Sequence, residues 1–189
     1  MLDALLQLDG NVLLWIQEYV RNDFLSGLAA PYTMLGDAGF LWIVLSLLMV
    51  CFRRTRKAGV LALCAMALGL VAVNLTIKPL VDRPRPWLVV EGLTHIVEED
   101  DPHSFPSGHT CAAFAAGMIW LRALPWRWGR IAAVVLAVCM GLSRLYVGVH
   151  YPSDVMAGAI IGALCAWAAW RVYQIYHSGK LNLLNKKER

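Results

Sequence analysis

Long stretches without charged side chains constrain this 189-residue chain more than any other feature. Residues 58–77 form an uncharged run that is long enough to cross a bilayer. Four further apolar runs contain no more than one charged residue each: 24–52, 110–126, 131–149 and 155–170. Hydrophobic residues make up 59% of the chain and charged residues 16%, whereas soluble domains have about half and a quarter. This composition predicts a membrane protein and excludes a disordered chain, a collagen-like repeat and a disulfide-stapled mini-protein.

The apolar runs predict an all-α fold, a polytopic membrane helical bundle with about five transmembrane helices. We expect one integral-membrane domain over residues 1–189, with a cytoplasmic tail at 177–189. Residues 8–21 alternate apolar and polar side chains at helical spacing, so 1–23 is predicted to form an amphipathic interfacial helix. The five cysteines lie inside apolar runs without any C-x-x-C pair, which favours packing over a disulfide or zinc framework.

The distribution of charge predicts the orientation. Most of the 17 basic residues fall in alternate connections and in the tail: Arg53, Arg54, Arg56, Lys57, Arg122, Arg127, Arg130, Arg171, Lys180, Lys186, Lys187 and Arg189. Basic connections stay in the cytoplasm, so we expect a multi-pass protein of the inner (plasma) membrane with its N-terminus outside and its C-terminus inside. The net charge of +4 then reflects topology, and binding to nucleic acid is not expected.

Five basic residues remain on the opposite side: Arg21, Lys78, Arg83, Arg85 and Arg144. Arg144 lies near the outer end of an apolar helix, where a charge is costly and usually faces the interior of a bundle or a polar cavity. Lys78 ends the 58–77 run, and we expect Pro79 to stop that helix. Several cations at one level of the membrane predict a site for an anionic ligand.

Two further segments reach the same side. The Pro106-Ser107-Gly108 run is predicted to open a helix, with Ser107 as its N-cap and free backbone N–H groups pointing at the ligand. In the second segment, His150 and Asp154 are four residues apart around a helix start at Pro152. This spacing brings the carboxylate to one imidazole nitrogen and leaves the other free.

These groups together predict phosphoryl transfer. Lys78, Arg85 and Arg144, with Ser107 and the Gly108 N–H, would neutralise and orient a phosphate.

The imidazole of His150, held by Asp154, is a competent nucleophile toward phosphorus. His109 can protonate the leaving oxygen and later activate water. No cluster of carboxylates is available for magnesium in the sequence, so we expect no metal and no cofactor.

Three motifs resemble the signature of the type 2 phosphatidic acid phosphatase superfamily: K-x6-R-P from Lys78 to Pro86, P-S-G-H from Pro106 to His109, and S-R-x5-H-x3-D from Ser143 to Asp154. The resemblance covers residues 78–154 and implies a helical bundle with its site at the outer membrane face. It implies a phosphohistidine on His150 with Asp154 as the residue that orients it, and an acid/base role for His109. It also implies a phosphate cradle of Lys78, Arg85, Ser107, Gly108 and Arg144. The chain is also similar to short bacterial members, which include undecaprenyl-pyrophosphate and phosphatidylglycerophosphate phosphatases.

Other features have a plainer interpretation. Arg83 lies off the motif's arginine position, and the acidic run 98–101 is expected to be a solvated loop face. Asp37 is either an intramembrane functional group or a polar helix start. Gly158 and Gly162 have small-xxx-small spacing, which favours packing within the bundle over dimerisation.

We therefore expect a membrane phosphatase that acts on a polyprenyl diphosphate of the undecaprenyl pyrophosphate type. Phosphatidylglycerophosphate or phosphatidic acid is the alternative substrate. An anion transporter and a vanadate-dependent haloperoxidase are remote alternatives. The expected partners are a lipid phosphate substrate and membrane lipids, and the oligomeric state stays open.

Overall fold

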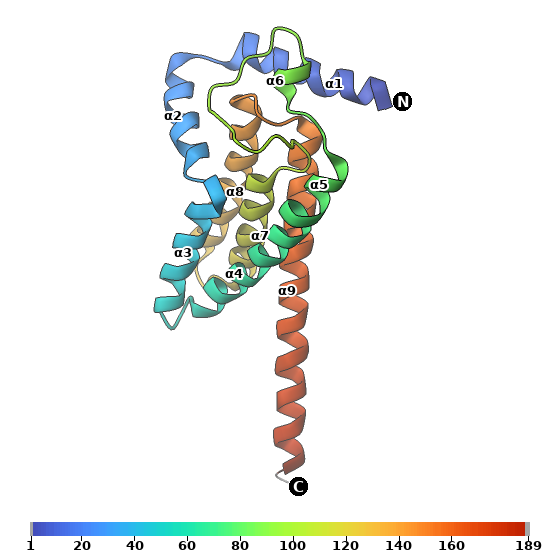
Figure 1. The fold of residues 1–189 in the computed structure, drawn as a ribbon. Helices are drawn as coiled ribbons and strands as arrows, with labels where there is room; N and C mark the ends of the chain where they lie inside the picture. Colours follow the sequence, from blue (N-terminus) through green and yellow to red (C-terminus); the bar gives the residue numbers. More distant parts are fainter. Residues whose placement is uncertain (1, 188–189) are drawn as a thin grey trace.

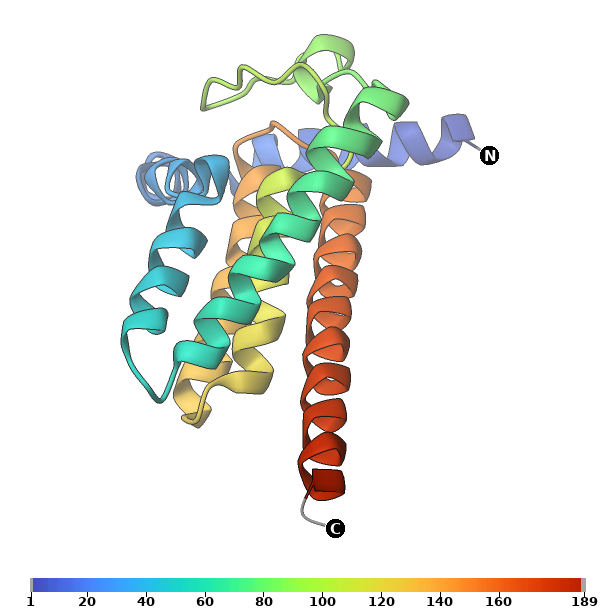
Figure 2. The same ribbon diagram turned by 60° about the horizontal axis from the view of Figure 1, so that its bottom comes forward.

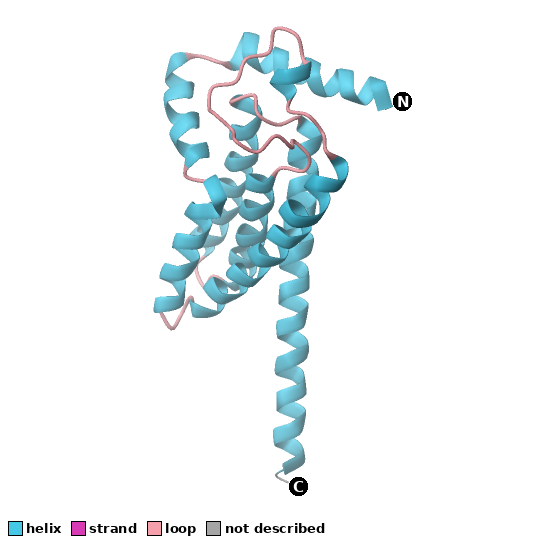
Figure 3. Cartoon of the chain, in the orientation of Figure 1, coloured by secondary structure: helices cyan, strands magenta, loops and turns pink. Residues whose placement is uncertain are grey.

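The computed structural model describes residues 2–187, which form helices joined by turns and one long loop, with no strand among these residues (Figures 1 and 3). The α-helices are α1 (Leu2–Trp15), α2 (Asp23–Met34), α3 (Phe40–Cys51), α4 (Arg56–Leu70), α5 (Lys78–Val81), α6 (Pro86–Val89), α7 (Gly108–Ala123), α8 (Arg127–Tyr146) and α9 (Pro152–Lys187). Other helical turns are η1 (Ile16–Val20), η2 (Asp37–Gly39) and η3 (Val71–Ile77). The predicted all-α class is confirmed.

Helix α7 lies at the centre of the bundle and packs against α4, α8 and α9, while α3 packs against α4 (Figures 1 and 2). Six of its eight buried residues are small (alanine, glycine, threonine or cysteine), which lets neighbouring backbones approach. Trp120 of α7 and Trp42 of α3 fill the core near its middle, with ring centroids 5.6 Å apart. A small-residue helix is therefore enclosed by larger side chains from its neighbours.

Two glycines of α9 set its distance from α7. A Cβ built on Gly158 would lie 2.5 Å from the carbonyl oxygen of Ser107, and one on Gly162 would lie 2.4 Å from that of Cys111. Both distances are shorter than real Cβ contacts, so these positions require glycine. The small-xxx-small pattern thus serves packing within the bundle. Because Gly158 is one turn after Asp154, it also fixes the start of α7 beside that carboxylate.

Within residues 2–187, three helical segments are long and apolar enough to cross a membrane: Arg56–Val81, Arg127–Tyr146 and Pro152–Ser178. The pair Asp23–Met34 and Asp37–Cys51, bent by 56°, makes a fourth if it forms one broken span. The expected number was about five, and α7 accounts for the difference, since its 16 residues fall short of the roughly 20 that a span needs. The membrane bundle itself is confirmed.

The turns at 52–55 and 124–126 lie at one end of the bundle, and the long loop after α6 and the 147–151 turn lie at the other (Figure 2). Helix α1 lies across this second end, nearly perpendicular to α9 (Figure 2). Two of the basic clusters are therefore at the first end, as the charge pattern predicts. The predicted tail starts within α9, which continues to Lys187, and residues 188–189 lie outside the described part.

The prediction that Pro79 stops its helix is wrong. The chain passes from α4 through the π-helical turn η3 into α5 and ends at Asp82, which is left-handed with φ of 48°. Pro79 directly follows the π-helical turn η3, where the regular α-helical hydrogen-bond pattern is already interrupted.

Candidate active site

The buried side chains of His150 and Asp154 are in contact at the start of α9. Nδ1 of His150 lies 3.4 Å from Oδ2 of Asp154, and Nε2 lies 3.1 Å from Nη1 of Arg85. Burial, followed by the positive charges of Arg144 and Arg85, holds the pKa of His150 well below its ordinary value. The imidazole is therefore neutral near pH 7. The spacing of the two residues predicts this contact correctly, but the second nitrogen is not free as expected, because Arg85 contacts it.

Asp154 is held by partners that the motif spacing does not reveal. Arg83 donates from Nη1 over 2.6 Å, and the backbone N–H of Tyr151 donates over 2.9 Å. The buried hydroxyl of Ser104 makes a third bond. Nη2 of Arg83 also lies 2.9 Å from Asp9 of α1. Arg83, which lies off the motif position, therefore fixes the carboxylate that contacts His150.

The N-terminus of α7 faces the same region. Ser107 is its N-cap, as predicted, and its Oγ accepts from the backbone N–H of Thr110 over 3.3 Å. The backbone N–H of Ser107 donates to the carbonyl oxygen of Asp154 over 3.1 Å. A Cβ on Gly108 would lie 3.4 Å from Oδ1 of Asn74. The first turn of α7 is thus joined directly to the start of α9.

The three predicted cradle cations are buried and paired with acids of the long loop. Arg144 and Lys78 contact Glu99 and Asp101 respectively. Nη2 of Arg85 lies 3.4 Å from Oε1 of Glu99 and 3.9 Å from Oδ2 of Asp101. Within the described residues, Arg85 Nη2 and Arg144 Nε are buried nitrogens that have no hydrogen-bond acceptor. The cations thus converge as predicted, with carboxylates already among them.

The expectation that 98–101 is a solvated face is wrong for two of its residues. The side chain of Glu98 is 97% exposed, but those of Glu99 and Asp101 are 16% and 32% exposed. Burial alone would raise the pKa of Asp101, but hydrogen bonds from Lys78 and from the N–H of His103 lower it to about 2. Charge composition did not reveal these pairs because they depend on how the loop folds back.

His109 lies in the first turn of α7, and its Nε2 is 2.8 Å from Oδ1 of Asp37 in the turn η2. Sequence reasoning left the role of Asp37 open. The structure places it against one of the predicted site histidines. Nearby, Oγ1 of Thr33 in α2 accepts from Nη1 of Arg144 over 2.9 Å.

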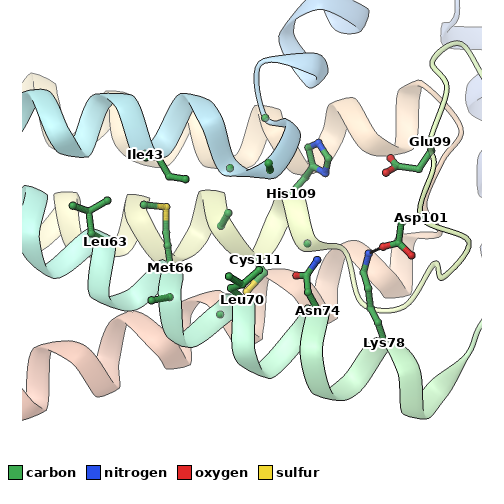
Figure 4. Close-up of a pocket in the computed structure, with 17 residues that line it drawn as sticks. Ile43, Leu63, Met66, Leu70, Asn74, Lys78, Glu99, Asp101, His109 and Cys111 are labelled. Atoms are coloured by element: carbon green, nitrogen blue, oxygen red, sulfur yellow. Dashed lines mark hydrogen bonds and ion pairs between the residues drawn. The ribbon is translucent and has the colours of Figure 1, made fainter.

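A cavity of about 610 Å³ extends from the polar side chains into the bundle. Ile43, Leu63 and Met66 line one end, and Lys78 and His109 line the other (Figure 4). Its shape and lining suit a ligand with a charged head and an apolar tail.

Arg85, Arg144 and His150 do not line this cavity in the described part of the chain. Glu99 does, and it contacts both guanidinium groups. Its carboxylate therefore separates the cavity from the two arginines.

The predicted site residues thus gather at one end of the bundle, in a cluster of contacts around α7 and the start of α9. The predicted list is His150, His109, Asp154, Lys78, Arg85, Ser107, Gly108 and Arg144. It omits Asp37, Thr33, Arg83, Ser104, Glu99 and Asp101. Asp37 carried a signal, because it is the single charge between residues 24 and 52, and Arg83 carried one as a basic residue on the side of the site.

The chain is similar to known proteins over most of its length. An undecaprenyl-diphosphatase of Sulfolobus acidocaldarius is 29% identical over 78% of this chain and 69% of that protein. The bacitracin transport permease protein BcrC of Bacillus licheniformis is 30% identical, and the match covers 87% of this chain and 86% of the BcrC chain. The crystal structure of a transmembrane PAP2-type phosphatidylglycerolphosphate phosphatase from Bacillus subtilis covers 90% of this chain and 87% of that one, with a TM-score of 0.73 and 26% identity.

A membrane helical bundle with a histidine–carboxylate pair beside buried cations is typical of a membrane enzyme that acts on phosphate groups. A family model for the PAP2 superfamily matches residues 58–177. The chain therefore belongs to the PAP2 superfamily, and it is a lipid phosphatase.

Proposed function

We propose that this protein removes the terminal phosphate of a polyprenyl diphosphate of the undecaprenyl pyrophosphate type, at the outer face of the plasma membrane. The observation that carries the proposal is the neutral, buried His150 between Asp154 and Arg85. A neutral imidazole whose Nδ1–H is held by a carboxylate presents a lone pair on Nε2. That lone pair is the nucleophile.

In the first step, Nε2 of His150 attacks the terminal phosphorus, and a P–N bond forms as the P–O bond to the leaving group breaks. The leaving oxygen takes a proton from His109. In the second step, water attacks the phosphohistidine, His109 accepts a proton from that water, and inorganic phosphate is released with His150 restored. No metal ion is needed in this route, because the protein's own cations carry the charge of the phosphate.

Arg85 and Arg144 are paired with Glu99, but each keeps one buried nitrogen that could donate to a phosphate oxygen. Arg85 Nη2 and Arg144 Nε are among the buried nitrogens without a hydrogen-bond acceptor in the described part, and phosphate oxygens would accept from both. Lys78, the hydroxyl of Ser107 and the N–H of Gly108 complete the cradle, with the positive end of the α7 dipole behind them.

The substrate proposal rests on the relatives and the cavity. Both the undecaprenyl-diphosphatase and BcrC align with most of this chain, and the apolar end of the cavity suits a hydrocarbon tail. Phosphatidylglycerophosphate or phosphatidic acid is the second candidate, favoured by the structural match to the B. subtilis phosphatase. We place the site outside because two basic clusters lie at the opposite end of the bundle. We also propose that residues 1–189 act as one domain, with residues 78–154 as its catalytic part.

The test is phosphate release by detergent-purified protein in EDTA from undecaprenyl diphosphate, phosphatidylglycerophosphate and phosphatidic acid. We expect the first to give the highest kcat/KM. His150→Ala abolishes release and also abolishes the acid-labile phosphoenzyme trapped from labelled substrate. His177→Ala, near the other end of α9, is the matched control. Normal turnover by His150→Ala refutes the mechanism, and preference for a glycerophospholipid refutes the substrate.

A further inference from the structure

Asp37 interrupts the bent helix pair next to the cavity. It lies in the turn η2 between α2 and α3, and its Oδ1 is 2.8 Å from Nε2 of His109. The side chain of His109 is 12% exposed and lines the cavity. Nε2 is engaged by Asp37, so Nδ1 is the nitrogen left for exchange of a proton with a ligand.

The turn has a backbone that fits closely around the ring. A Cβ on Gly36 would lie 2.8 Å from Cδ2 of His109 and 2.7 Å from Cε of Met140, so a larger residue would displace both side chains. Ala38 and Gly39 both have positive φ, 50° and 74°. For Ala38 this left-handed conformation is costly, and it persists where the surroundings hold it. The break in the helix pair therefore presents the Asp37 carboxylate to His109.

The positive charges around His109 explain why a carboxylate is needed beside it. Arg144, Lys78 and Arg85 are positively charged neighbours of His109. They oppose a positive charge on its ring, yet the ring must carry one in order to donate a proton. A carboxylate at hydrogen-bond distance stabilises an imidazolium and fixes its orientation.

We propose that Asp37 is a positioning residue that orients His109 and stabilises its imidazolium while His109 protonates the leaving oxygen. The proton passes from Nδ1 of His109 to that oxygen as the P–O bond breaks, and Asp37 stays ionised throughout. The neutral ring then accepts a proton from the water that hydrolyses the phosphohistidine. This inference rests on the acid/base role of His109 in the proposed function.

The test compares two leaving groups. The alkoxide released from phosphatidic acid needs a proton, whereas the p-nitrophenolate released from p-nitrophenyl phosphate does not. We measure kcat/KM, which covers the steps up to formation of the phosphoenzyme. Asp37→Asn should lower kcat/KM by about tenfold or more for phosphatidic acid and by less than about twofold for p-nitrophenyl phosphate. Asp37→Glu should recover part of the loss.

Asp23→Asn, at the exposed start of α2, is the control and should match the wild type with both substrates. An equal loss with both substrates in Asp37→Asn means a structural role and overturns the inference. The His109→Ala variant distinguishes an error about Asp37 from an error about the acid role of His109. If its loss is confined to phosphatidic acid while that of Asp37→Asn is not, only Asp37 is misassigned. If His109→Ala also affects both substrates equally, the acid role in the proposed function fails as well.

Discussion

The proposed function assigns Arg85 and Arg144 to the substrate phosphate, and the carboxylate of Glu99 contacts both of these guanidinium groups. Its Oε2 is hydrogen-bonded to Nη2 of Arg144, its Oε1 lies 3.4 Å from Nη2 of Arg85, and both arginine side chains are 1% exposed. A phosphate that binds these cations must first displace Glu99. Glu99→Gln removes the competing charge while keeping the shape of the side chain, so it should strengthen the binding of anions.

The magnitude follows from the bond that is lost. A hydrogen bond to a charged group contributes about 1.5–3 kcal/mol, and each 1.4 kcal/mol is about a factor of ten in affinity. Glu99→Gln should therefore lower the Kd for inorganic phosphate by about tenfold to a hundredfold. The same bond stabilises the empty enzyme, so the free energy of unfolding without phosphate should fall by about 1.5–3 kcal/mol. That loss corresponds to a fall in Tm of about 3–12 °C for a chain of this size.

Titration calorimetry with inorganic phosphate measures the first effect, and thermal unfolding with and without phosphate measures the second. Glu98→Gln is the matched control, since its neighbouring side chain is 97% exposed. The reasoning is refuted if Glu99→Gln binds phosphate more weakly than the wild type, because Glu99 would then position the arginines instead of competing for them. Unchanged affinity refutes it equally.

Two further predictions concern stability. Gly162→Ala places a Cβ 2.4 Å from the carbonyl oxygen of Cys111, so it should reduce stability by about 1–3 kcal/mol, whereas Gly27→Ala meets nothing within 4 Å and should leave Tm equal or higher. Equal Tm losses in the two variants would contradict the close approach of α7 and α9. The Asp101 pKa of about 2 lies below its ordinary 3.8, so its ion pair stabilises the fold above about pH 4 and is lost as the pH falls through about 2. The Tm difference between wild type and Asp101→Asn should therefore shrink from pH 4 to pH 2, and a constant difference would argue against the pair.

Local spacing and scarcity of charge made part of the site predictable. His150 and Asp154 are four residues apart at a helix start, so their contact follows from helix geometry. Lys78 and Arg144 were conspicuous because a charge in an apolar helix has few explanations. In the same way, Gly158 and Gly162 needed only their own spacing to suggest close packing.

The remaining contacts depend on segments far apart in the chain. Asp37 and His109 are 72 residues apart, and Glu99 and Arg144 are 45 apart. No periodicity links such pairs, and an acidic run in a loop is usually solvated. The path of the long loop, which decides these pairs, follows from tertiary packing. Arg83 was undervalued for the same reason, since its two carboxylate partners come from opposite ends of the sequence.

Because Arg83 pairs with two carboxylates, the activity of a variant that lacks α1 needs careful interpretation. Arg83 joins Asp9 of α1 to Asp154, and Asp9 also accepts from the backbone N–H of Ser153 over 3.1 Å. Deleting the first helix would thus remove one of two anions from the guanidinium that holds the carboxylate of Asp154. Lost activity in such a deletion would report on the geometry around His150 as much as on attachment to the bilayer. Asp9→Asn separates the two, because it leaves the apolar face of α1 intact.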